Sequence, residues 1–524
     1  MNLSYFALIA PLCACTVLAA TPCQTLRTLS LPNARMQFAQ STAATTMLGL
    51  GAFLVKTPAF CRAGGIITPS SDSDIHFEVW LPESGWNGEF RGTGNGGFAG
   101  SINYSEMAAA LRDGYATAST DTGHSADGID AGWALGHPEK ITDFGYRAIH
   151  EMTIKAKAVI QAFYGEAPKH AFFSSCSNGG RQALMEAQRF PEDYDGILAG
   201  APANYWTHLL VAGFYASAQA MLEDPAKYIP KEKIPALAKA VLDACDADDG
   251  LKDGILSDPP SCHFDPASIV CKGPESDNCL TPPQADSLKR IYAGARNADG
   301  SAIYPGYEPG GEDGGGGWSA WITGPKAGSS AGNLFSKGFM RNMVFSNSSW
   351  TDKGTDLSAT LAAADSKLAG TLNATDANLK PFQERGGKLI VYHGWSDAAI
   401  PPRNAIEYYG NVNKALGETT VDGFLRLYMA PGVQHCAGGP GPSLFGQFGV
   451  LKAGDAKHDI FTALVDWVEK GTPPEAIVAT KYAKDDPAQP AEMTRPICPF
   501  PLAAKYDGKG DYKQAESFAC VGAR

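Results

Sequence analysis

The sequence lacks two features that would place the protein in a membrane or on nucleic acid. No run of about 18 or more apolar residues follows the N-terminal segment, so we expect no helix that spans a bilayer. Basic residues are in the minority, because 43 Lys and Arg face 55 Asp and Glu, for a formal net charge of −12. A chain with this charge is a poor partner for nucleic acid or for an anionic membrane surface.

The remaining composition is that of a large globular protein. The chain has 524 residues, of which 44% are hydrophobic and 19% are charged. This length is enough for one domain with a large insertion or for two domains.

The N-terminal stretch resembles a secretory signal peptide. Residues 1–20 contain an apolar segment that ends in small residues, with cleavage expected near Ala19 or Ala20. The segment starts without Lys or Arg, and its LCAC stretch, which ends at Cys15, resembles a lipoprotein processing site, which is the alternative. We expect a secreted or periplasmic protein after removal of the signal peptide.

The cysteine content agrees with export. Twelve cysteines, less Cys13 and Cys15 in the signal segment, leave ten, an even number that is typical of a disulfide-bonded secreted protein. Sequence alone does not determine the pairing, but local spacing suggests four short-range bridges and leaves one long-range pair. The suggested pairs are Cys23–Cys61, Cys245–Cys262, Cys271–Cys279, Cys498–Cys520 and, over the long range, Cys176–Cys436.

Strand and helix patterns alternate in residues 21–203 and 387–524. Apolar runs such as AFFSS and KLIVYHG predict buried strands, and residues 144–164 predict a long amphipathic helix. This alternation favours an α/β fold with a mainly parallel sheet covered by helices on both faces. Residues 204–386 are instead rich in Gly, Asp, Asn, Pro and Trp, so we expect an inserted domain there.

The stretch SSCSNGGRQ, residues 174–182, is typical of a nucleophile elbow, in which a strand, a sharp glycine-rich turn and a helix present a serine. Ser175 stands where the usual pattern has glycine. Asp397 and His435 each follow a later predicted strand, so the order is Ser177, Asp397, His435. This is the order of the α/β-hydrolase fold, in which the histidine takes the serine proton and the aspartate orients the histidine.

Each of these residues also has a plainer interpretation. Asp397 could end a turn or cap a helix, and His435 could be a structural histidine. The agreement of three positions favours a catalytic triad. A Cys176–Cys436 bridge would join the neighbours of Ser177 and His435 and hold the two segments together, although such a bridge could equally be a stabiliser that lies near the site by chance.

A hydrolase that uses such a triad also needs two backbone N–H groups that bind the oxyanion. We expect one from Asn178, directly after the nucleophile, and the second from the glycine-rich run GTGNGGFAG, with Gly96 favoured and Gly97 next. The same run matches the dinucleotide pattern G-x-G-x-x-G, but no clear helix opens there. The oxyanion interpretation is therefore preferred.

An acidic run, CDADDGLKDGILSDP (245–259), is a candidate metal site. Its carboxylates repel one another unless they are solvated or neutralised by a hard cation such as Ca²⁺. It is not an EF-hand, because the twelfth position from Asp246 is Ser257 and not Glu. The alternative is a solvated acidic turn.

Taken together, these motifs resemble those of the tannase and feruloyl esterase family. They are C-S-N-G-G-R at the elbow, G-W-S-D before the acid, Q-H-C at the base and G-N-G-G-F-A-G in the oxyanion loop, and the similarity spans about residues 23–520. The five cysteine pairs look like the set of this family. The resemblance implies that the insertion is a lid, and that it binds structural calcium. The implied ligands are the side chains of Asp246, Asp249 and Asp253 and the carbonyls of Leu251 and Ile255.

The resemblance also implies hydrolysis of esters of aromatic acids. Trp318, Trp321 and Phe335 are candidates to clamp a flat ring, although such residues more often form core, and His393 either lines the pocket or caps a strand end. The branch that hydrolyses mono(2-hydroxyethyl) terephthalate has a lid arginine for the free carboxylate and an aromatic residue where this chain has Ile400. Residues 324–339 contain lysines but no arginine.

We therefore expect a secreted serine esterase that cleaves feruloyl- or galloyl-type esters. Terephthalate monoester hydrolysis is one alternative, and a peptidase or lipase specificity is another. A catalytically silent binding protein on the same scaffold is a third, which the intact triad disfavours.

Overall fold

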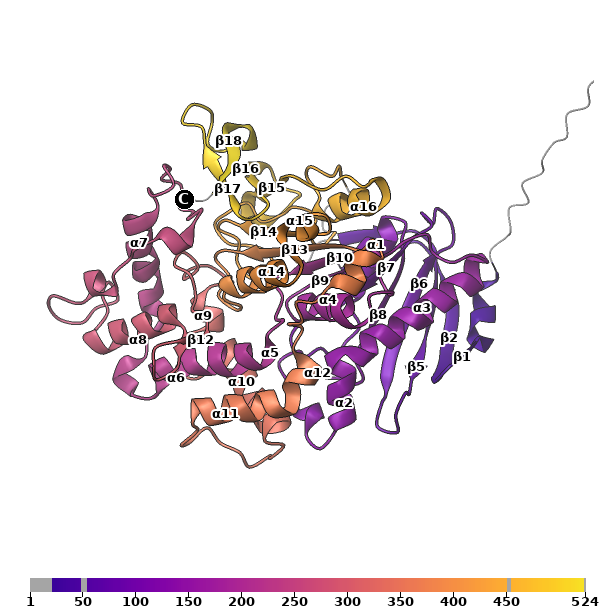
Figure 1. Cartoon of the computed structure of the whole chain (residues 1–524), viewed down its shortest axis with the longest axis horizontal. Helices are drawn as coiled ribbons and strands as arrows, with labels where there is room; N and C mark the ends of the chain where they lie inside the picture. The colour runs from indigo at the N-terminus through magenta and orange to yellow at the C-terminus, as the bar shows by residue number, and fades with distance from the viewer. Residues whose placement is uncertain (1–20, 49–53, 450–453, 523–524) are drawn as a thin grey trace, which may run out of the picture.

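Figure 1 shows a computed structural model of the chain, which describes residues 21–48, 54–449 and 454–522. The predicted signal peptide lies outside these residues. A ten-stranded sheet forms the centre of the structure. Its strands, in spatial order, are β1 (Ser30–Leu31), β2 (Ala34–Thr42), β5 (Phe60–Ile67), β6 (Ile75–Pro82), β8 (Ala116–Thr120), β7 (Phe90–Thr93), β9 (Ala171–Cys176), β10 (Gly196–Gly200), β13 (Lys388–Gly394) and β14 (Leu425–Ala430).

The sheet is parallel where the predicted site residues lie. The strands from β8 to β14 in the spatial order pair in parallel, whereas β1, β2, β5, β6 and β8 pair antiparallel. All residues of β9 and β10 are buried, because helices cover both faces. This explains why these strands read as continuous apolar runs and not as alternating patterns.

Helices cover the two faces of the sheet. On one face α3 (Ala148–Tyr164), α4 (Asn178–Arg189) and α14 (Arg403–Leu416) share an apolar core with Phe173. On the other face α16 (Ile460–Lys470) packs against Phe172, and α1 (Tyr104–Arg112) lies over the same side. The helix predicted over 144–164 is α3, preceded by a π-helical turn at Asp143–Arg147. The predicted α/β architecture with a mainly parallel sheet is confirmed.

Residues between β10 and β13 form a mostly helical segment that gathers at one end of the sheet (Figure 1). One of its cores surrounds Trp318, and a second combines Trp206 and Phe335 with Phe98 from the loop after β7. Its α- and π-helices are α5 (Trp206–His208), a π-helix (Leu209–Tyr215), α6 (Ala216–Leu222), α7 (Ile234–Cys245), α8 (Pro282–Ala293), α9 (Trp318–Trp321), α10 (Ala331–Phe339), a π-helix (Met340–Val344), α11 (Leu357–Ala364), a π-helix (Asp365–Ala369), α12 (Gly370–Leu372) and α13 (Lys380–Glu384), with the hairpin β11 (Ala295–Arg296) and β12 (Ala302–Tyr304).

Small hairpins complete the fold. They are β3 (Thr45–Leu48) with β4 (Leu54–Thr57), β15 (Ile477–Tyr482) with β16 (Ala491–Ile497), and β17 (Leu502–Tyr506) with β18 (Phe518–Gly522). The structure forms all five disulfides that the cysteine spacing suggested. Within the described ranges, no helix combines the length and the apolar character needed to cross a bilayer.

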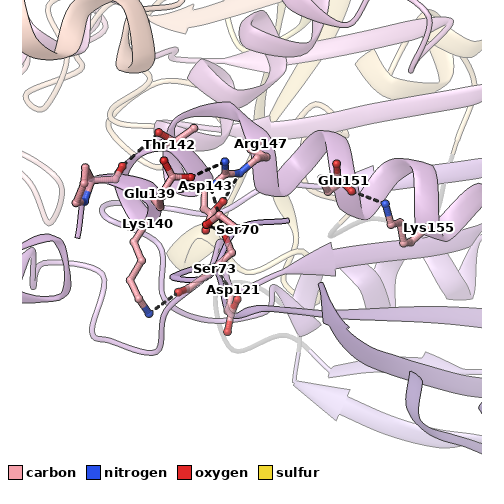
Figure 2. A network of polar contacts seen from close by, with 12 residues as sticks. Ser70, Ser73, Asp121, Glu139, Lys140, Thr142, Asp143, Arg147, Glu151 and Lys155 are labelled. Atoms are coloured by element: carbon pink, nitrogen blue, oxygen red, sulfur yellow. Dashed lines mark hydrogen bonds and ion pairs between the residues drawn. The ribbon is translucent and has the colours of Figure 1, made fainter. Parts of the chain in front are cut away.

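A polar network at the start of α3 ties the loop after β8 to the helices (Figure 2). Arg147 donates to the buried carboxylate of Asp143 at 2.6 Å and to Ser73 Oγ at 3.0 Å. Lys140, from the short helix α2 (Pro138–Thr142), donates to the carbonyl of Gly123 at 3.1 Å. Arg147 thus holds the loop between β5 and β6, and Lys140 holds the loop that follows β8.

Glu106 on α1 gives the fold a testable pH dependence. It is 4% exposed, and burial raises its pKa to about 7 despite the opposing effects of Arg91 and Asn103. A raised carboxyl pKa stabilises the fold fully below about pH 4.5, and this contribution is lost as the pH rises to about 7. The loss is on the order of 3 kcal/mol.

We expect the Glu106→Gln variant to gain stability relative to the wild type as the pH rises from 5 to 8, since glutamine mimics the protonated acid. Urea unfolding at both pH values measures the difference. Glu83→Gln, at an exposed position, is the control and should show no such trend. If the free energy of unfolding differs between the wild type and Glu106→Gln by the same amount at both pH values, the raised pKa of Glu106 is contradicted.

Candidate active site

The candidate nucleophile lies at a strained turn between β9 and α4. Ser177 has φ 67° and ψ −124°, a positive φ that non-glycine residues rarely adopt and that costs on the order of 1–3 kcal/mol. A Cβ on Gly179 would lie 2.4 Å from Ser175 Cβ, and one on Gly94 would lie 3.0 Å from the same atom. Glycines that face Ser175 therefore make room for the serine that replaces the usual glycine of the elbow.

The structure brings the three predicted catalytic residues together. His435 Nε2 lies 2.9 Å from Ser177 Oγ, and His435 Nδ1 lies 2.9 Å from Asp397 Oδ2. The other carboxylate oxygen of Asp397 accepts hydrogen bonds from the backbone N–H groups of Ala399 and Ile400 at 2.8 and 2.9 Å. These bonds hold the aspartate in place. Because Asp397 binds the Nδ1 side of the His435 ring, the other ring nitrogen, Nε2, faces Ser177 and can take its proton.

His393 contacts the aspartate and does not line the cavity. It is fully buried, and its Nε2 lies 3.1 Å from Asp397 Oδ2 and 3.0 Å from the carbonyl of Ile400. Burial alone would raise the pKa of Asp397, but the interactions with His435 and His393 outweigh it and hold the pKa well below its ordinary value. The prediction that His393 lines the pocket is therefore wrong. The alternative, a histidine that caps the strand end, agrees with its place near the end of β13 and its bond to the carbonyl of Ile400, and the ring also contacts the carboxylate of Asp397.

A disulfide links the nucleophile segment to the histidine segment. Cys176 and Cys436 are bonded across 260 residues, with their Cα atoms 6.0 Å apart. Cys176 is the residue before Ser177, and Cys436 is the residue after His435. The bridge therefore limits how far the imidazole can move from the hydroxyl.

The predicted oxyanion donors lie around Ser177. Among the described residues, the backbone N–H groups of Gly96, Gly97 and Asn178 have no hydrogen-bond acceptor. Gly97 and Asn178 line the cavity beside Ser177, whereas Gly96, the favoured candidate, is outside the lining. A Cβ on Gly97 would lie 2.2 Å from the carbonyl of Gly128, so only glycine fits there.

The cavity next to Ser177 is almost entirely apolar. Trp321 packs edge-on against His435 at 5.3 Å, and Trp321 and Phe335 stack at 6.1 Å. The lining is formed by Gly97, Ser177, Asn178, Ala203, Trp206, Leu209, Leu210, Phe214, Trp321, Phe335, Ala399, Ile400 and His435. Three of the predicted substrate-binding residues, Trp321, Phe335 and Ile400, are in this lining.

Trp318 is a second correction. Its side chain is fully buried in the core of the inserted segment, where it packs 5.5 Å from Tyr292, so it does not clamp a substrate. Sequence reasoning also missed Trp206, Leu209, Leu210 and Phe214. The sequence feature that could have indicated these residues is the apolar run WTHLLVAGFY, which follows the carboxyl end of strand β10.

Comparison with known proteins places this geometry in a family. Residues 61–521 match the family described as tannase and feruloyl esterase. The chain belongs to the tannase and feruloyl esterase family. It is 42% identical to an uncharacterized esterase of Xanthomonas campestris pv. campestris, over 97% of this chain and 92% of that protein.

Two further relatives agree with this family. A probable feruloyl esterase B-1 of Aspergillus fumigatus is 33% identical over 90% of this chain and 88% of its own length. The crystal structure of feruloyl esterase B from Aspergillus oryzae superposes with a TM-score of 0.86 at 29% identity, covering 95% of this chain and 99% of that chain. The esterase therefore has the α/β-hydrolase fold and is a carboxylic ester hydrolase of tannase or feruloyl esterase type.

The acidic loop of this esterase offers an all-oxygen donor set. Asp246 accepts from the N–H of Gly254 at 3.0 Å, and burial, followed by repulsion from Asp253 and Asp249, raises its pKa. Asp249 Oδ2 is buried without a hydrogen-bond partner. Asp253 forms a buried ion pair with Arg495 on β16, which takes up one of its oxygens. The unsatisfied oxygen of Asp249 and the repulsion among these carboxylates fit a hard cation. Within the described residues, however, only His150, Glu186 and Asp193 bring three candidate ligand atoms within 4.8 Å of one another, so the loop as it stands does not form a closed set of ligands.

We expect the double variant Cys176→Ser, Cys436→Ser to lose both stability and turnover. Chain-entropy reasoning gives about 5 kcal/mol for a loop of this length. We expect kcat to fall about tenfold or more, because the base is less well held against the nucleophile.

Turnover of a model ester at a temperature where both proteins are folded measures this effect. The matched control is Cys271→Ser, Cys279→Ser, which opens a bridge in the inserted segment away from the cavity and should leave kcat unchanged. If the first double variant keeps the wild-type kcat, the Cys176–Cys436 bridge only stabilises the fold.

Proposed function

We propose that the protein is a secreted serine esterase that cleaves uncharged aromatic acid esters, of feruloyl or galloyl type, through an acyl-enzyme. The observation that carries the proposal is the Ser177–His435–Asp397 hydrogen-bonded chain at the mouth of an apolar, aromatic-walled cavity.

The proposed reaction has two halves. Ser177 Oγ attacks the ester carbonyl carbon as His435 Nε2 takes its proton, and Asp397 holds the Nδ1–H side of the ring. The oxyanion is bound by the N–H of Asn178 and an N–H of the Gly96–Gly97 turn. His435 then gives its proton to the departing alcohol. Water, activated by the same histidine, releases the acid and restores the serine.

The walls of the cavity support an uncharged, flat acyl group. Among the described residues, its lining holds no Lys, Arg, Asp or Glu, and Ser177 is its only hydroxyl side chain. Neither lysine of the 324–339 stretch is in the lining, and Lys337 is paired with Asp352 at 2.7 Å. A terephthalate carboxylate would therefore be buried without a partner, which is costly. The three hydroxyls of a galloyl group would be less well satisfied than the single phenol of a feruloyl group.

Five disulfides among the described residues support an exported protein, since such bonds persist in oxidising compartments. The proposal includes removal of residues 1–20 as a signal peptide. It also includes the inserted segment, residues 204–386, as a lid, which is supported by the wall residues that this segment contributes to the cavity.

Acid release from methyl ferulate, methyl gallate and mono(2-hydroxyethyl) terephthalate tests the proposal. We expect turnover to be fastest for the ferulate and slowest for the terephthalate monoester. Ser177→Ala should lower kcat by about 10⁴-fold or more. The wild type, but not the variant, should react with a fluorophosphonate. A folded wild type that turns over none of the esters contradicts the substrate class, and one that also resists the fluorophosphonate contradicts the triad.

We also propose that the acidic loop binds a structural Ca²⁺ through Asp246, Asp249 and Asp253 with the carbonyls of Leu251 and Ile255. A bound cation would neutralise the loop and help to hold it against β16.

Removal of calcium with EDTA should lower Tm, and added Ca²⁺ should restore it. At a calcium concentration of about 100 Kd the stabilisation is about 2.7 kcal/mol. Asp249→Asn should abolish the calcium-dependent shift, whereas Asp277→Asn, at an exposed position outside the loop, should keep it. A Tm that does not respond to EDTA or Ca²⁺ in the wild type would refute the calcium site.

A further inference from the structure

The loop that carries Gly96 and Gly97 is held against the nucleophile helix by a buried pair of amides. Asn95 Oδ1 accepts from Gln182 Nε2 at 3.1 Å, and Gln182 Oε1 accepts from the backbone N–H of Asn95 at 2.9 Å. Gln182 is 1% exposed and Asn95 is 4% exposed. Gln182 lies on α4, little more than one turn after Ser177. The two bonds therefore join the residue before Gly96 to the helix whose first N–H belongs to Asn178.

The hydrogen bonds of Asn95 allow only one orientation of the pair. Asn95 Nδ2 donates to the carbonyls of Ser101 at 2.8 Å and Thr120 at 2.7 Å. A flipped Asn95 would lose both bonds, so its Oδ1 must face Gln182. Gln182 must then present its Nε2–H to that oxygen and its Oε1 to the backbone of Asn95. In this arrangement alone, each nitrogen and oxygen of the two side-chain amides has a hydrogen-bond partner.

Hydrogen bonds also hold the loop at Phe98, directly after the Gly96–Gly97 turn. His124 Nε2 lies 2.8 Å from the carbonyl of Phe98, and burial lowers the pKa of His124 to about 4, so the ring is neutral and donates this bond. The N–H of Phe98 donates to Gly128 at 2.6 Å. The segment with His124 is itself held by the bond from Lys140 to Gly123 (Figure 2). The Gly96–Gly97 turn is thus fixed between two supports.

The glycine-rich loop packs closely against the start of α4, the helix that follows Ser177. A Cβ added to Gly94 would lie 2.5 Å from Gln182 Oε1 and 3.0 Å from the Cα of Gly179. The loop therefore contacts the elbow directly at Gly94, and the amide pair sets its position at the next residue. The distance between an N–H of the Gly96–Gly97 turn and the N–H of Asn178 depends on this contact.

We propose that Gln182, through Asn95, is a positioning residue that sets the spacing of the two oxyanion donors. The proposal rests on the serine esterase function proposed above. An oxyanion forms only in the transition state and the tetrahedral intermediate, so a misplaced donor lowers kcat and leaves binding of the ground-state ester almost unchanged.

The test is a comparison of Gln182→Met and Gln182→Glu with the wild type. Methionine has a similar length but makes neither bond, so we expect kcat for methyl ferulate to fall about 10- to 100-fold with KM changed by less than about threefold. Affinity for an aryl boronic acid, which mimics the tetrahedral intermediate, should fall in parallel with kcat/KM. Inhibition by the product ferulate should be unchanged.

The Gln182→Glu variant adds a readout that a purely structural role would not give. It keeps the acceptor for Asn95 N–H, but when ionised it places an oxygen against Asn95 Oδ1. When protonated it can donate there, and burial favours the protonated form. Its kcat, expressed as a fraction of the wild-type kcat at the same pH, should therefore recover as the pH falls from 8 to 5. This near-isosteric variant also keeps the test available if Gln182→Met fails to fold.

The matched control is Gln284→Met on α8. Gln284 is 5% exposed, its Oε1 accepts from the N–H of Thr281 at 2.9 Å, and its Nε2 donates to the carbonyl of Tyr228 at 3.0 Å. It is thus a buried glutamine whose amide also accepts from one backbone N–H and donates to one oxygen, with a further bond from Lys233 Nζ at 2.8 Å, and it lies outside the cavity lining. We expect a lower Tm and an unchanged kcat.

The possible failures are distinguishable. If the wild type hydrolyses methyl ferulate and Gln182→Met keeps kcat within about twofold, the positioning role is overturned and the esterase function stands. Equal losses of kcat in Gln182→Met and Gln284→Met, or a Gln182→Glu ratio that does not change with pH, also overturn it. A wild type that hydrolyses none of the esters overturns both proposals.

Discussion

The parallel pairing of β9, β10, β13 and β14 is the constraint on which the rest of the site depends. In this register Cys176 lies opposite Gly200, Gly200 opposite Tyr392, and Gly394 opposite Ala430, so the strands end at one edge of the sheet. The candidate nucleophile, acid and base each follow the end of one of these strands. These strands are apolar and buried on both faces, and a slip by one residue would move every side chain to the opposite face, where its packing partners are different.

This dependence explains why the sequence was informative about the catalytic residues. The position of a residue that follows a strand is largely fixed by that strand. Strands buried on both faces can be recognised in a sequence as apolar runs. Ser177, Asp397 and His435 were identified in this way, and the structure brings them within hydrogen-bond distance. The parallel sheet, its covering helices and four of the disulfides were predicted for similar reasons, because each follows from local patterns or spacing, whereas Cys176–Cys436 was the long-range pair that remained.

The cavity wall was much harder to predict. Trp318 and Trp321 belong to the same four-residue helix, too short to show a periodicity, yet Trp318 is in the core and Trp321 packs against His435. The wall residues of the apolar run after β10 lie partly in a π-helix, whose residue spacing differs from the helical pattern used to read a sequence. His393 has a partner only because the chain turns back after Asp397. Which apolar residue faces a cavity depends on packing between distant segments, and local sequence carries little information on that.

The elbow itself explains why its neighbours need such firm support. Ser177 is held in a strained conformation, and a strained residue persists only when the surrounding structure determines its position. The disulfide from Cys176 holds the segment with the base on one side of the serine, and the amides of Gln182 and Asn95 hold the glycine turn on the other. Both attachments are made by residues within five positions of the serine, on a strand end and a helix that are buried in the core. The base and the glycine turn are therefore both attached to the strand and helix that carry Ser177. The inserted segment adds the walls of the cavity and also bonds to the loops of the base and the acid, because Gly316 N–H donates to Gln434 Oε1 at 3.0 Å and Ser396 Oγ donates to the carbonyl of Gly310 at 2.9 Å.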